Sequence, residues 1–298
     1  DDGRTGAWHA AAGMLAPVAE AAFGEHRLTE LLVASVAAWP AFAADLGGPL
    51  EFAVSGSLLV GVTEGDEAEI ARYLSYQESL GLPVTSLTAA RLRLREPALH
   101  PGVRAGAYTE IDAQVDPRAL VARLRQACRE AGARTVSARV TDVRVLDADV
   151  TVVAAGCGSA DLVGVPVHPV RGETLRLRGG PRLAHMVRGH VHGRHVYLVP
   201  RPNGEIVVGA TSSEETAREP TVGGVQELLN DAIALVPELR QAEFREAAVG
   251  FRPGTADNLP IVERREPGLI VATGHYRNGI ALTPWTAARV VELAEVGA

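Results

Sequence analysis

The sequence of 298 residues is short of cysteine and of aromatic residues, and it has no excess of positive charge. Its two cysteines, Cys128 and Cys157, stand far apart and at no metal-binding spacing, so we expect free, buried thiols in a reducing setting. The net charge of −7 argues against nucleic acid or an anionic membrane as the main partner. No apolar run approaches the roughly 20 residues that span a bilayer, and the polar start shows no secretory signal. A cytoplasmic protein is therefore expected.

The remaining composition is ordinary for a globular protein, with 47% hydrophobic and 22% charged residues. Asp116 and Pro117 predict the N-cap and first position of a helix that ends at Gly132. An extended run follows at 135–145. Residues 150–156 are rich in β-branched side chains and end in glycine, which predicts a buried strand of the parallel type.

The middle of the chain has an antiparallel character. Residues 195–201 and 205–211 flank Pro202-Asn203-Gly204, which is a strong hairpin signal. The α/β segments at both ends enclose this meander. We therefore predict a mixed α/β (α+β) fold, in which a discontinuous Rossmann-like domain carries a second domain built on an antiparallel sheet.

Near the C-terminus, a short apolar run at 269–272 is followed by Gly274 and Gly279 and then by Thr283-Pro284. We expect a buried strand, a glycine-bearing loop, and a helix that Thr283 caps with Pro284 at its first position. Backbone N–H groups at such a helix start can hold an anionic or electron-rich ligand group. The alternative is a simple strand–turn–helix connection.

The N-terminal stretch at 7–17 is rich in small apolar residues around Gly13. A run of small side chains lets the backbone approach a bulky ligand closely. The alternative is an alanine-rich helix, against which Gly13 and Pro17 both argue.

Motifs spread over the whole chain carry a resemblance to a known family. They are Ala-Ala-Ala-Gly-Met-Leu-Ala-Pro (10–17), Val-Arg-Gly-Glu (170–173), His-Val-Tyr-Leu-Val-Pro-Arg (195–201), Val-Val-Gly-Ala-Thr (207–211), Gly-Phe-Arg-Pro-Gly-Thr-Ala-Asp-Asn-Leu-Pro (250–260) and Gly-His-Tyr-Arg-Asn-Gly-Ile (274–280). With these motifs in this order, the chain resembles the glycine oxidases of thiazole (thiamine) biosynthesis, within the D-amino acid oxidase family of flavoproteins.

One departure from the family concerns the start of the chain. Family members begin with a strand, Gly-x-Gly-x-x-Gly and a helix that hold the FAD pyrophosphate, but this sequence contains no Gly-x-Gly-x-x-Gly. By resemblance, Asp1 or Asp2 lies near the acidic residue that holds the ribose hydroxyls. We expect the missing strand to exist upstream, since a doubly wound sheet without its central first strand would leave its neighbours unpaired.

The resemblance implies how a substrate would be held. Arg252 is expected to bind the carboxylate of an amino acid by two parallel hydrogen bonds, with Tyr197 adding another. Before the resemblance is considered, Arg252 could equally be a surface ion-pair residue and Tyr197 a core tyrosine. His195 is expected at the mouth of the site, and Arg277 beside both the flavin and the carboxylate. Ser212 stands where a relative carries a methionine, which suggests a different pocket polarity.

The resemblance also implies FAD as cofactor, glycine or another small amino acid and O2 as reactants, and a homo-oligomer. The amine would be bound neutral, its α-hydrogen would pass as hydride to the flavin, and O2 would become H2O2; the imine would be hydrolysed or used in thiazole synthesis. No protein base is required, so positioning is the main catalytic contribution. The cofactor would be contacted by Ala7, Trp8, Ala12, Gly13, Met14, Val140, Ala155, Gly156, His275, Tyr276, Arg277, Asn278, Gly279, Ile280 and Ala281.

The domain division follows from the same resemblance. The FAD-binding domain is expected at residues 1–45, 105–165 and 250–298. The substrate-binding domain is expected at 46–104 and 166–249.

Three other interpretations of the sequence remain open. The first is a flavin-dependent oxidase or dehydrogenase of another secondary or cyclic amino acid. The second is a flavin-free remnant that serves as a binding module. The third is a zinc enzyme, because His190 and His192 would share a strand face, but no third ligand stands at a fixed short spacing and no metal is expected.

Overall fold

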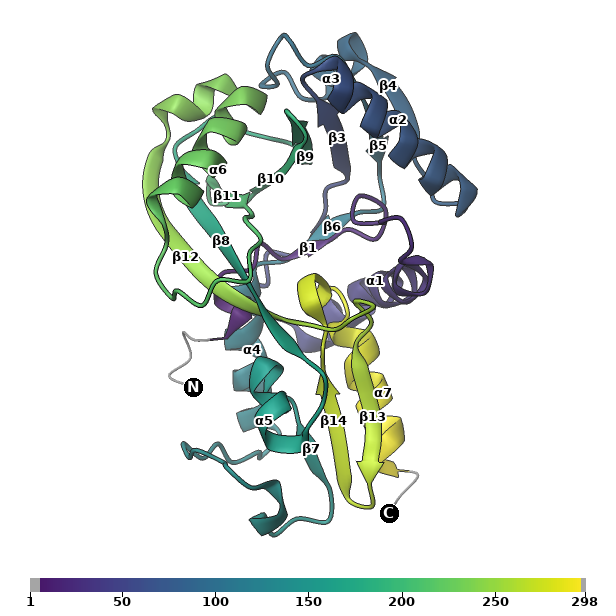
Figure 1. The fold of residues 1–298 in the computed structure, drawn as a ribbon, viewed down its shortest axis with the longest axis vertical. Coiled ribbons are helices and arrows are strands. Elements are labelled where there is room, and N and C mark those ends of the chain that lie inside the picture. Colours follow the sequence, from purple (N-terminus) through teal and green to yellow (C-terminus); the bar gives the residue numbers. More distant parts are fainter. Residues whose placement is uncertain (1–5, 296–298) are drawn as a thin grey trace.

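A computed structural model of the protein describes residues 6–295. Its largest element is an eight-stranded sheet, which fills the upper half of Figure 1. Every neighbouring pair in this sheet is antiparallel except β3 and β9, which run parallel. In sheet order the strands are β12 (Glu243–Gly254), β8 (His168–Arg178), β11 (Glu205–Gly209), β10 (Arg194–Pro200), β9 (Met186–Val191), β3 (Ser57–Gly61), β5 (Ala105–Thr109) and β4 (Thr85–Thr88).

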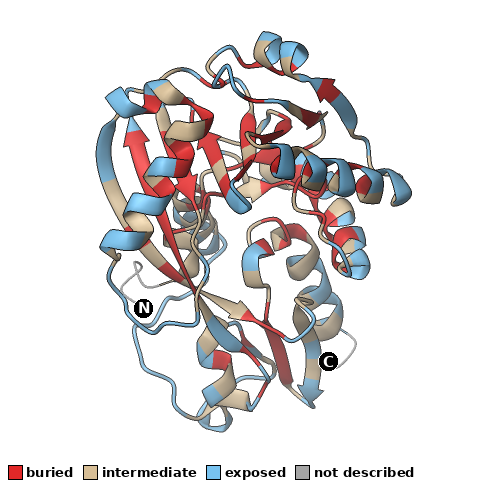
Figure 2. Ribbon diagram, turned by 45° about the horizontal axis from the view of Figure 1, so that its top comes forward, coloured by how far each residue is buried: buried red, intermediate tan, exposed pale blue. Residues whose placement is uncertain are grey.

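Helix α6 (Val222–Leu235) covers one face of the large sheet. Leu228 and Leu235 of α6 are buried with Leu175, Leu198 and other strand residues in the main apolar core. Figure 2 shows the result, with buried strands behind helices whose outer faces are exposed. The 3₁₀ turn η4 (Pro237–Gln241) then leads into β12. The opposite face of the sheet is therefore left for the functional site.

Helix α2 (Glu64–Ser79) is tied to the turn between β9 and β10 by Asp66. With Thr63, Asp66 forms a capping box at the start of α2. Its carboxylate also accepts hydrogen bonds from the backbone N–H groups of His192 and Gly193, at 3.1 and 2.8 Å. One buried carboxylate thus fixes both a helix start and a hairpin turn. The next helix is α3 (Ala89–Arg95).

A small sheet and helix α1 (His26–Leu46) form a second core. The sheet has the order β1 (Met14–Leu15), β6 (Ala113–Gln114), β2 (Ala53–Val54). Helix α1 has the length and apolar character of a membrane-crossing helix, with a mean hydropathy of 1.2. Its Leu28, Leu32 and Trp39 are nevertheless buried against other elements, and the Trp39 indole donates to the Ala281 carbonyl at 3.0 Å. This packing is that of a core helix.

The third sheet occupies the lower half of Figure 1. Strand β14 (Leu269–Thr273) pairs in parallel with β7 (Thr151–Val153) and antiparallel with β13 (Ile261–Glu266). This confirms the parallel strand predicted from 150–156, although Val152 is exposed rather than buried. Helix α4 begins as predicted, since Asp116 accepts from the N–H groups of Arg118 and Ala119. The helices of this half are α4 (Pro117–Glu130), α5 (Ser159–Val163) and α7 (Thr283–Glu295).

Several local predictions are wrong. The extended run at 135–145 forms no strand; it is exposed and contains only the 3₁₀ turn η2 (Val143–Val145). Cys157 is half-buried, but Cys128 is exposed. Thr283 does not cap α7: its hydroxyl donates to the Gly279 carbonyl at 3.1 Å, one turn back, and the helix begins at Thr283 itself.

The predicted boundary at residue 105 separates β5 from its partners. Strand β5 lies in the eight-stranded sheet between β3 and β4. The predicted boundary at residue 250 falls within β12, which pairs with β8 along its whole length. We propose that β5 and all of β12 belong to the substrate-binding domain, and that 1–45, 110–165 and 255–298 form the FAD-binding domain.

Candidate active site

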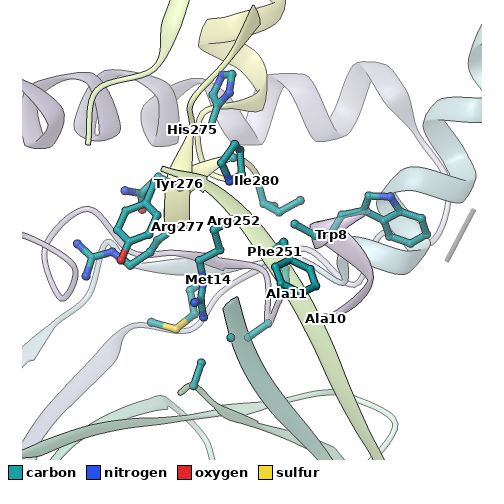
Figure 3. Close-up of a pocket in the computed structure, with 18 of the residues that line it drawn as sticks. Trp8, Ala10, Ala11, Met14, Phe251, Arg252, His275, Tyr276, Arg277 and Ile280 are labelled. Carbon is teal, nitrogen blue, oxygen red and sulfur yellow. The ribbon is translucent and has the colours of Figure 1, made fainter. Parts of the chain in front are cut away.

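A cavity of about 1740 Å³ lies against the free face of the large sheet. It is larger than the roughly 300–1,000 Å³ of a typical small-molecule pocket. Its walls come from the N-terminal stretch, the large sheet, the segment before α5, the loop before α7 and α7 itself, segments that are far apart in the sequence. Figure 3 shows part of this wall, with Trp8 and Arg277 on opposite sides of the view and Arg252 between them.

The floor of the cavity is a row of cross-strand neighbours. Tyr197 of β10 stands opposite Gly209 of β11 on one side and Arg188 of β9 on the other. Gly209 is paired in turn with Thr174 of β8. Cross-strand partners point to the same face of a sheet. Strand pairing alone therefore brings a phenol and a guanidinium to adjacent places in the cavity.

Two glycines make room on this floor. A Cβ atom on Gly209 would overlap the Tyr197 ring, and one on Gly172 would overlap the Arg252 guanidinium. The two polar side chains therefore lie flat over glycine positions of β11 and β8. Any other residue at these positions would lift them from the sheet.

Arg252 has no carboxylate partner among the described residues, a feature that it shares in this cavity with the exposed Arg218. Its hydrogen bonds go to the carbonyls of Arg171 and Thr211, at 3.3–3.4 Å. The positive charges of Arg252 and Arg188 both act to lower the pKa of Tyr197, although burial outweighs them and raises it. An unpaired cation beside a neutral phenol is suited to bind a carboxylate.

Three further guanidinium groups in the cavity wall carry acidic partners, one of them Arg194 with Asp231. Arg188 forms an ion pair with Glu20, and both side chains are mostly buried. Arg277 lies 3.3 Å from Glu25. In Figure 3, Arg277 and Tyr276 lie together on one side of the cavity.

A cluster of aromatic side chains lies beside this wall. The rings of His190 and His195 are 4.4 Å apart, and Tyr73 contacts both. Burial, with the charges of His195 and Arg188, lowers the pKa of His190 to about 4. Burial and Arg188 also lower the pKa of His195. Both imidazoles are therefore neutral near pH 7.

His190 and His192 do not share a strand face. Strand β9 ends at Val191, and His192 lies in the following turn with a positive φ of 51°. Within residues 6–295, no group of three possible ligands could hold a metal ion. The geometry on which the zinc alternative depended is thus wrong.

The N-terminal stretch is held by buried polar side chains behind it. The Thr174 hydroxyl donates to the Ala10 carbonyl at 2.7 Å, and the Arg201 guanidinium donates to the Ala12 carbonyl. Gly13 has a φ of 71°, and a Cβ there would overlap the Val115 carbonyl. The stretch is the irregular, close-packed backbone expected from its sequence. It contains only the 3₁₀ turn η1 (Ala7–His9) and β1.

The loop before α7 contains the 3₁₀ turn η5 (Tyr276–Asn278). In the described part of the chain, no hydrogen bond is formed by the backbone N–H groups of Gly279 and Ile280, which line the cavity. His275 is neutral, because burial lowers its pKa to about 4, and its Nε2 lies 2.8 Å from the Thr286 hydroxyl. Free N–H donors next to a helix start suit an electron-rich ring edge.

Most of the residues predicted from the sequence line this one cavity. They are Ala7, Trp8, Ala12, Gly13, Met14, Ala155, Gly156, His195, Tyr197, Arg252, His275, Tyr276, Arg277, Asn278, Gly279 and Ile280.

Two predicted cofactor residues lie outside the cavity wall, and one further prediction cannot be placed. Val140 stands in the exposed segment that precedes η2. Ala281 is buried, and its carbonyl accepts from Ser35 and Trp39. Asp1 and Asp2, predicted near the ribose, lie outside the described residues.

Sequence reasoning assigned no role to Glu20, Arg188 or Arg201. Each makes its contacts with residues remote in the sequence. No local pattern in the sequence marks these residues. The position of Arg188 opposite Tyr197 could have been predicted only if the register between β9 and β10 had been known.

The cavity fits a flavin at one end. It has free backbone N–H donors, a flat glycine-bearing wall, and open space where a side chain on Gly156 would meet nothing within 4 Å. Gly156 lies in the 3₁₀ turn η3 (Gly156–Gly158) before α5. The phosphate-binding fingerprint expected at the other end is not in the sequence.

Comparison with known proteins agrees with this cavity. The chain is 35% identical to the glycine oxidase of Geobacillus kaustophilus over 98% of its own length and 84% of that protein. The crystal structure of a glycine oxidase from this species superposes with a TM-score of 0.89 at 33% identity, covering 98% of this chain and 85% of the other.

Two other relatives extend the comparison. The bifunctional protein ThiO/ThiG of a Nostoc species is 34% identical over 98% of this chain, which corresponds to 48% of that protein. The glycine oxidase of Bacillus cereus superposes with a TM-score of 0.85 at 25% identity, over 98% of this chain and 87% of the other. The family model of FAD-dependent oxidoreductases, DAO, matches residues 1–293. The chain therefore belongs to the DAO family of FAD-dependent oxidoreductases.

Proposed function

We propose that this protein oxidises glycine or another small α-amino acid with FAD and O2, giving an imine or 2-oxo acid and H2O2. The observation that carries the proposal is the unpaired Arg252 guanidinium, which lies over Gly172 on the same sheet face as Tyr197. Two guanidinium donors can hold a carboxylate in a fixed orientation, and the phenol can supply a third hydrogen bond.

The chain's own residues would act mainly by positioning. Arg252 and Tyr197 would fix the carboxylate, and so place the α-carbon of the substrate over the cavity. His195 lies at the neighbouring wall, where it and His190 are neutral and add no positive charge near the amine. Arg277, paired with Glu25, would close the side of the cavity next to Tyr276.

The cofactor would be held along the wall opposite the sheet. Trp8, the 12–14 backbone, Ala155 and Gly156 would contact one part of it, and residues 275–280 the ring edge. The flavin, when bound, takes two electrons from the substrate and passes them to O2. The free N–H groups of Gly279 and Ile280 would stabilise negative charge on that ring edge.

We further propose that the imine product feeds thiazole synthesis. This rests on the resemblance of the chain to glycine oxidases and to the ThiO/ThiG protein of Nostoc. The alternative substrates are other secondary or cyclic amino acids, since Arg252 and Tyr197 would hold the carboxylate of any of them.

The test is a spectrum and a substrate profile. We expect the purified protein to show flavin absorbance and to release peroxide with glycine faster than with D-proline or D-alanine. Faster oxidation of proline would favour the cyclic-amine alternative. Peroxide formation with amines that have no carboxylate, at rates like that for glycine, would contradict the role given to Arg252.

A further inference from the structure

The ion pair between Arg188 and Glu20 has no assigned role in the site. Arg188 comes from the middle of the large sheet, next to Tyr197. Glu20 follows a segment whose backbone is fixed by Asp112, which accepts from the N–H groups of Val18 and Ala19 at 3.2 Å each. The pair therefore joins two rigid parts of the cavity wall, and both residues line the cavity.

Arg188 is bound differently from a structural arginine. The buried Arg171 uses its guanidinium on the Ala217 and Glu219 carbonyls as well as on Glu173. Within the described residues, Glu20 is the only hydrogen-bonding or ion-pairing partner of the Arg188 side chain. The remaining donors of this guanidinium have no acceptor among residues 6–295, although the side chain is only 17% exposed.

The charge on Arg188 is also costly to keep in this place. Burial, followed by the positive charge of Arg277, lowers the pKa of Arg188 to about 10. A buried cation of this kind needs an anionic or hydrogen-bonding partner, because leaving it unpaired is strongly destabilising. Arg188 is the cross-strand neighbour of Tyr197 and lines the same cavity as Arg252, so the two guanidinium groups border one region of the cavity.

We propose that Glu20 determines substrate specificity by occupying Arg188, so that of the Arg188 and Arg252 guanidinium groups only that of Arg252 is free, and the site accepts amino acids with one carboxylate. A second carboxylate on the substrate would meet the negative charge of Glu20, or would have to displace it and leave it buried without a partner. With Glu20 made neutral, Arg188 becomes a second anion-binding group for dicarboxylic amines. This proposal rests on the proposed function where oxidation is measured, but the measurement of binding does not depend on it.

The first experiment compares two secondary amines of similar size, N-ethylglycine and iminodiacetate, on the FAD-loaded enzyme. We expect Glu20→Gln to raise the ratio of kcat/KM for iminodiacetate over N-ethylglycine at least tenfold. Adding Arg188→Met should abolish the gain. Glu67→Gln is the matched control, since it removes the same charge from an exposed ion pair with Arg104. It should leave the ratio unchanged.

The second experiment measures binding without turnover. Diglycolate and methoxyacetate have no amine to oxidise and differ mainly by one carboxylate, and their affinities are measured by calorimetry. Glu20→Gln should tighten diglycolate relative to methoxyacetate at least tenfold, in a way that depends on Arg188. Glu20→Ser removes the same carboxylate and is used if Glu20→Gln loses its flavin.

The two experiments separate the two proposals. A gain in diglycolate binding without oxidation of any amino acid would overturn the proposed function but support the role of Glu20. An unchanged preference in the Glu20 variants, or a gain that persists without Arg188, would overturn the inference. Weaker binding of both acids by the Glu20 variants would also overturn it, because Glu20 would then contribute to holding the substrate.

Discussion

At the scale of single residues, Arg252 combines the lack of an acidic partner in the described part of the chain with a guanidinium that lies over Gly172 of the sheet. We predict that Arg252→Ala raises KM for glycine about a hundredfold or more, because charge-assisted hydrogen bonds to the carboxylate are lost. The flavin should remain bound, since no other role is required of this side chain. Steady-state kinetics and the flavin absorbance of the purified variant check both parts.

A second arginine in the cavity wall serves as the control for Arg252. Arg218 lies over the Phe251 ring, 6.0 Å from its centre, and also lines the cavity. Arg218→Ala should change KM by less than about fivefold, which corresponds to roughly 1 kcal/mol. Unaltered kinetics in the Arg252 variant, or equal losses in both variants, would contradict the assignment.

Gly172 gives a prediction in which function changes more than stability. An alanine there would overlap the Arg252 guanidinium, which is the mobile end of a long side chain. We expect Gly172→Ala to shift the guanidinium, to raise KM about tenfold, and to change the free energy of unfolding by less than about 1 kcal/mol. Gly223→Ala is the control, because a Cβ there meets nothing within 4 Å. Equal KM values for the two variants would contradict this geometry.

Single residues could be predicted from the sequence where they stand in motifs. Arg252, Tyr197 and the 274–280 loop carry motif signals, and the structure brings them to one cavity. Glu20 and Arg188 could not be found in this way. Their contact joins residues far apart in the chain, and it depends on strand register rather than on local pattern.

At the scale of elements, the loop between β11 and α6 is held by a buried ion pair beneath it. The Arg171 and Glu173 side chains are 2% and 1% exposed and lie 2.7 Å apart. Arg171 donates to two loop carbonyls, and Glu173 accepts from the N–H and the hydroxyl of Thr221 at the end of the loop. This pair therefore fixes the part of the loop that leads into α6.

We predict that Glu173→Gln lowers the free energy of unfolding by about 3 kcal/mol, because it leaves the Arg171 charge buried without its counter-ion. Glu263→Gln breaks an exposed pair with Arg265 and should cost less than about 0.5 kcal/mol. Urea unfolding measures both variants. Equal small effects would mean that water reaches Arg171 and screens its charge.

Elements could be predicted where local signals are strong. The Asp116 cap and the hairpin around Asn203 are examples, because each is stabilised within a few residues. Residues 135–145 show the limit of local patterns. Their side chains favour an extended chain, but a strand also needs a partner to pair with, and none is present in the described residues. Pro40 lies inside α1, where burial of Trp39 and its neighbours outweighs the local cost of proline.

At the scale of the whole molecule, the cavity lies where the large sheet meets the α/β segments. The sequence predicted these two parts and their discontinuous order, and the division between them remains our proposal. The boundaries near residues 105 and 250 could not be placed exactly, since β5 and β12 are assigned by pairing partners that are distant in the chain. The fold class can therefore be predicted from the order of helices and strands along the sequence, whereas the limits of each domain depend on which strands pair in the folded protein.

The free energy of unfolding should depend on pH through the titration of Asp112. This carboxyl is fully buried, and burial raises its pKa from 3.8 to about 6, against the lowering effect of the Val18 and Ala19 N–H groups. The folded state therefore holds this proton more tightly than the unfolded state does. Raising the pH from about 4 to about 7 should cost about 2–3 kcal/mol of stability from this group, with no further loss above that range.

The variant Asp112→Asn removes this titration and isolates it from the other carboxyl groups. We expect the difference in unfolding free energy between the wild-type protein and the variant to fall between pH 4 and 7 and to be flat from pH 7 to 8. The sign is opposite to that of Asp66, whose pKa is lowered and whose contribution is lost as the solution becomes acidic. Urea unfolding at several pH values gives the difference curve, and a flat curve throughout would mean that Asp112 ionises in the folded protein as it does in the unfolded chain.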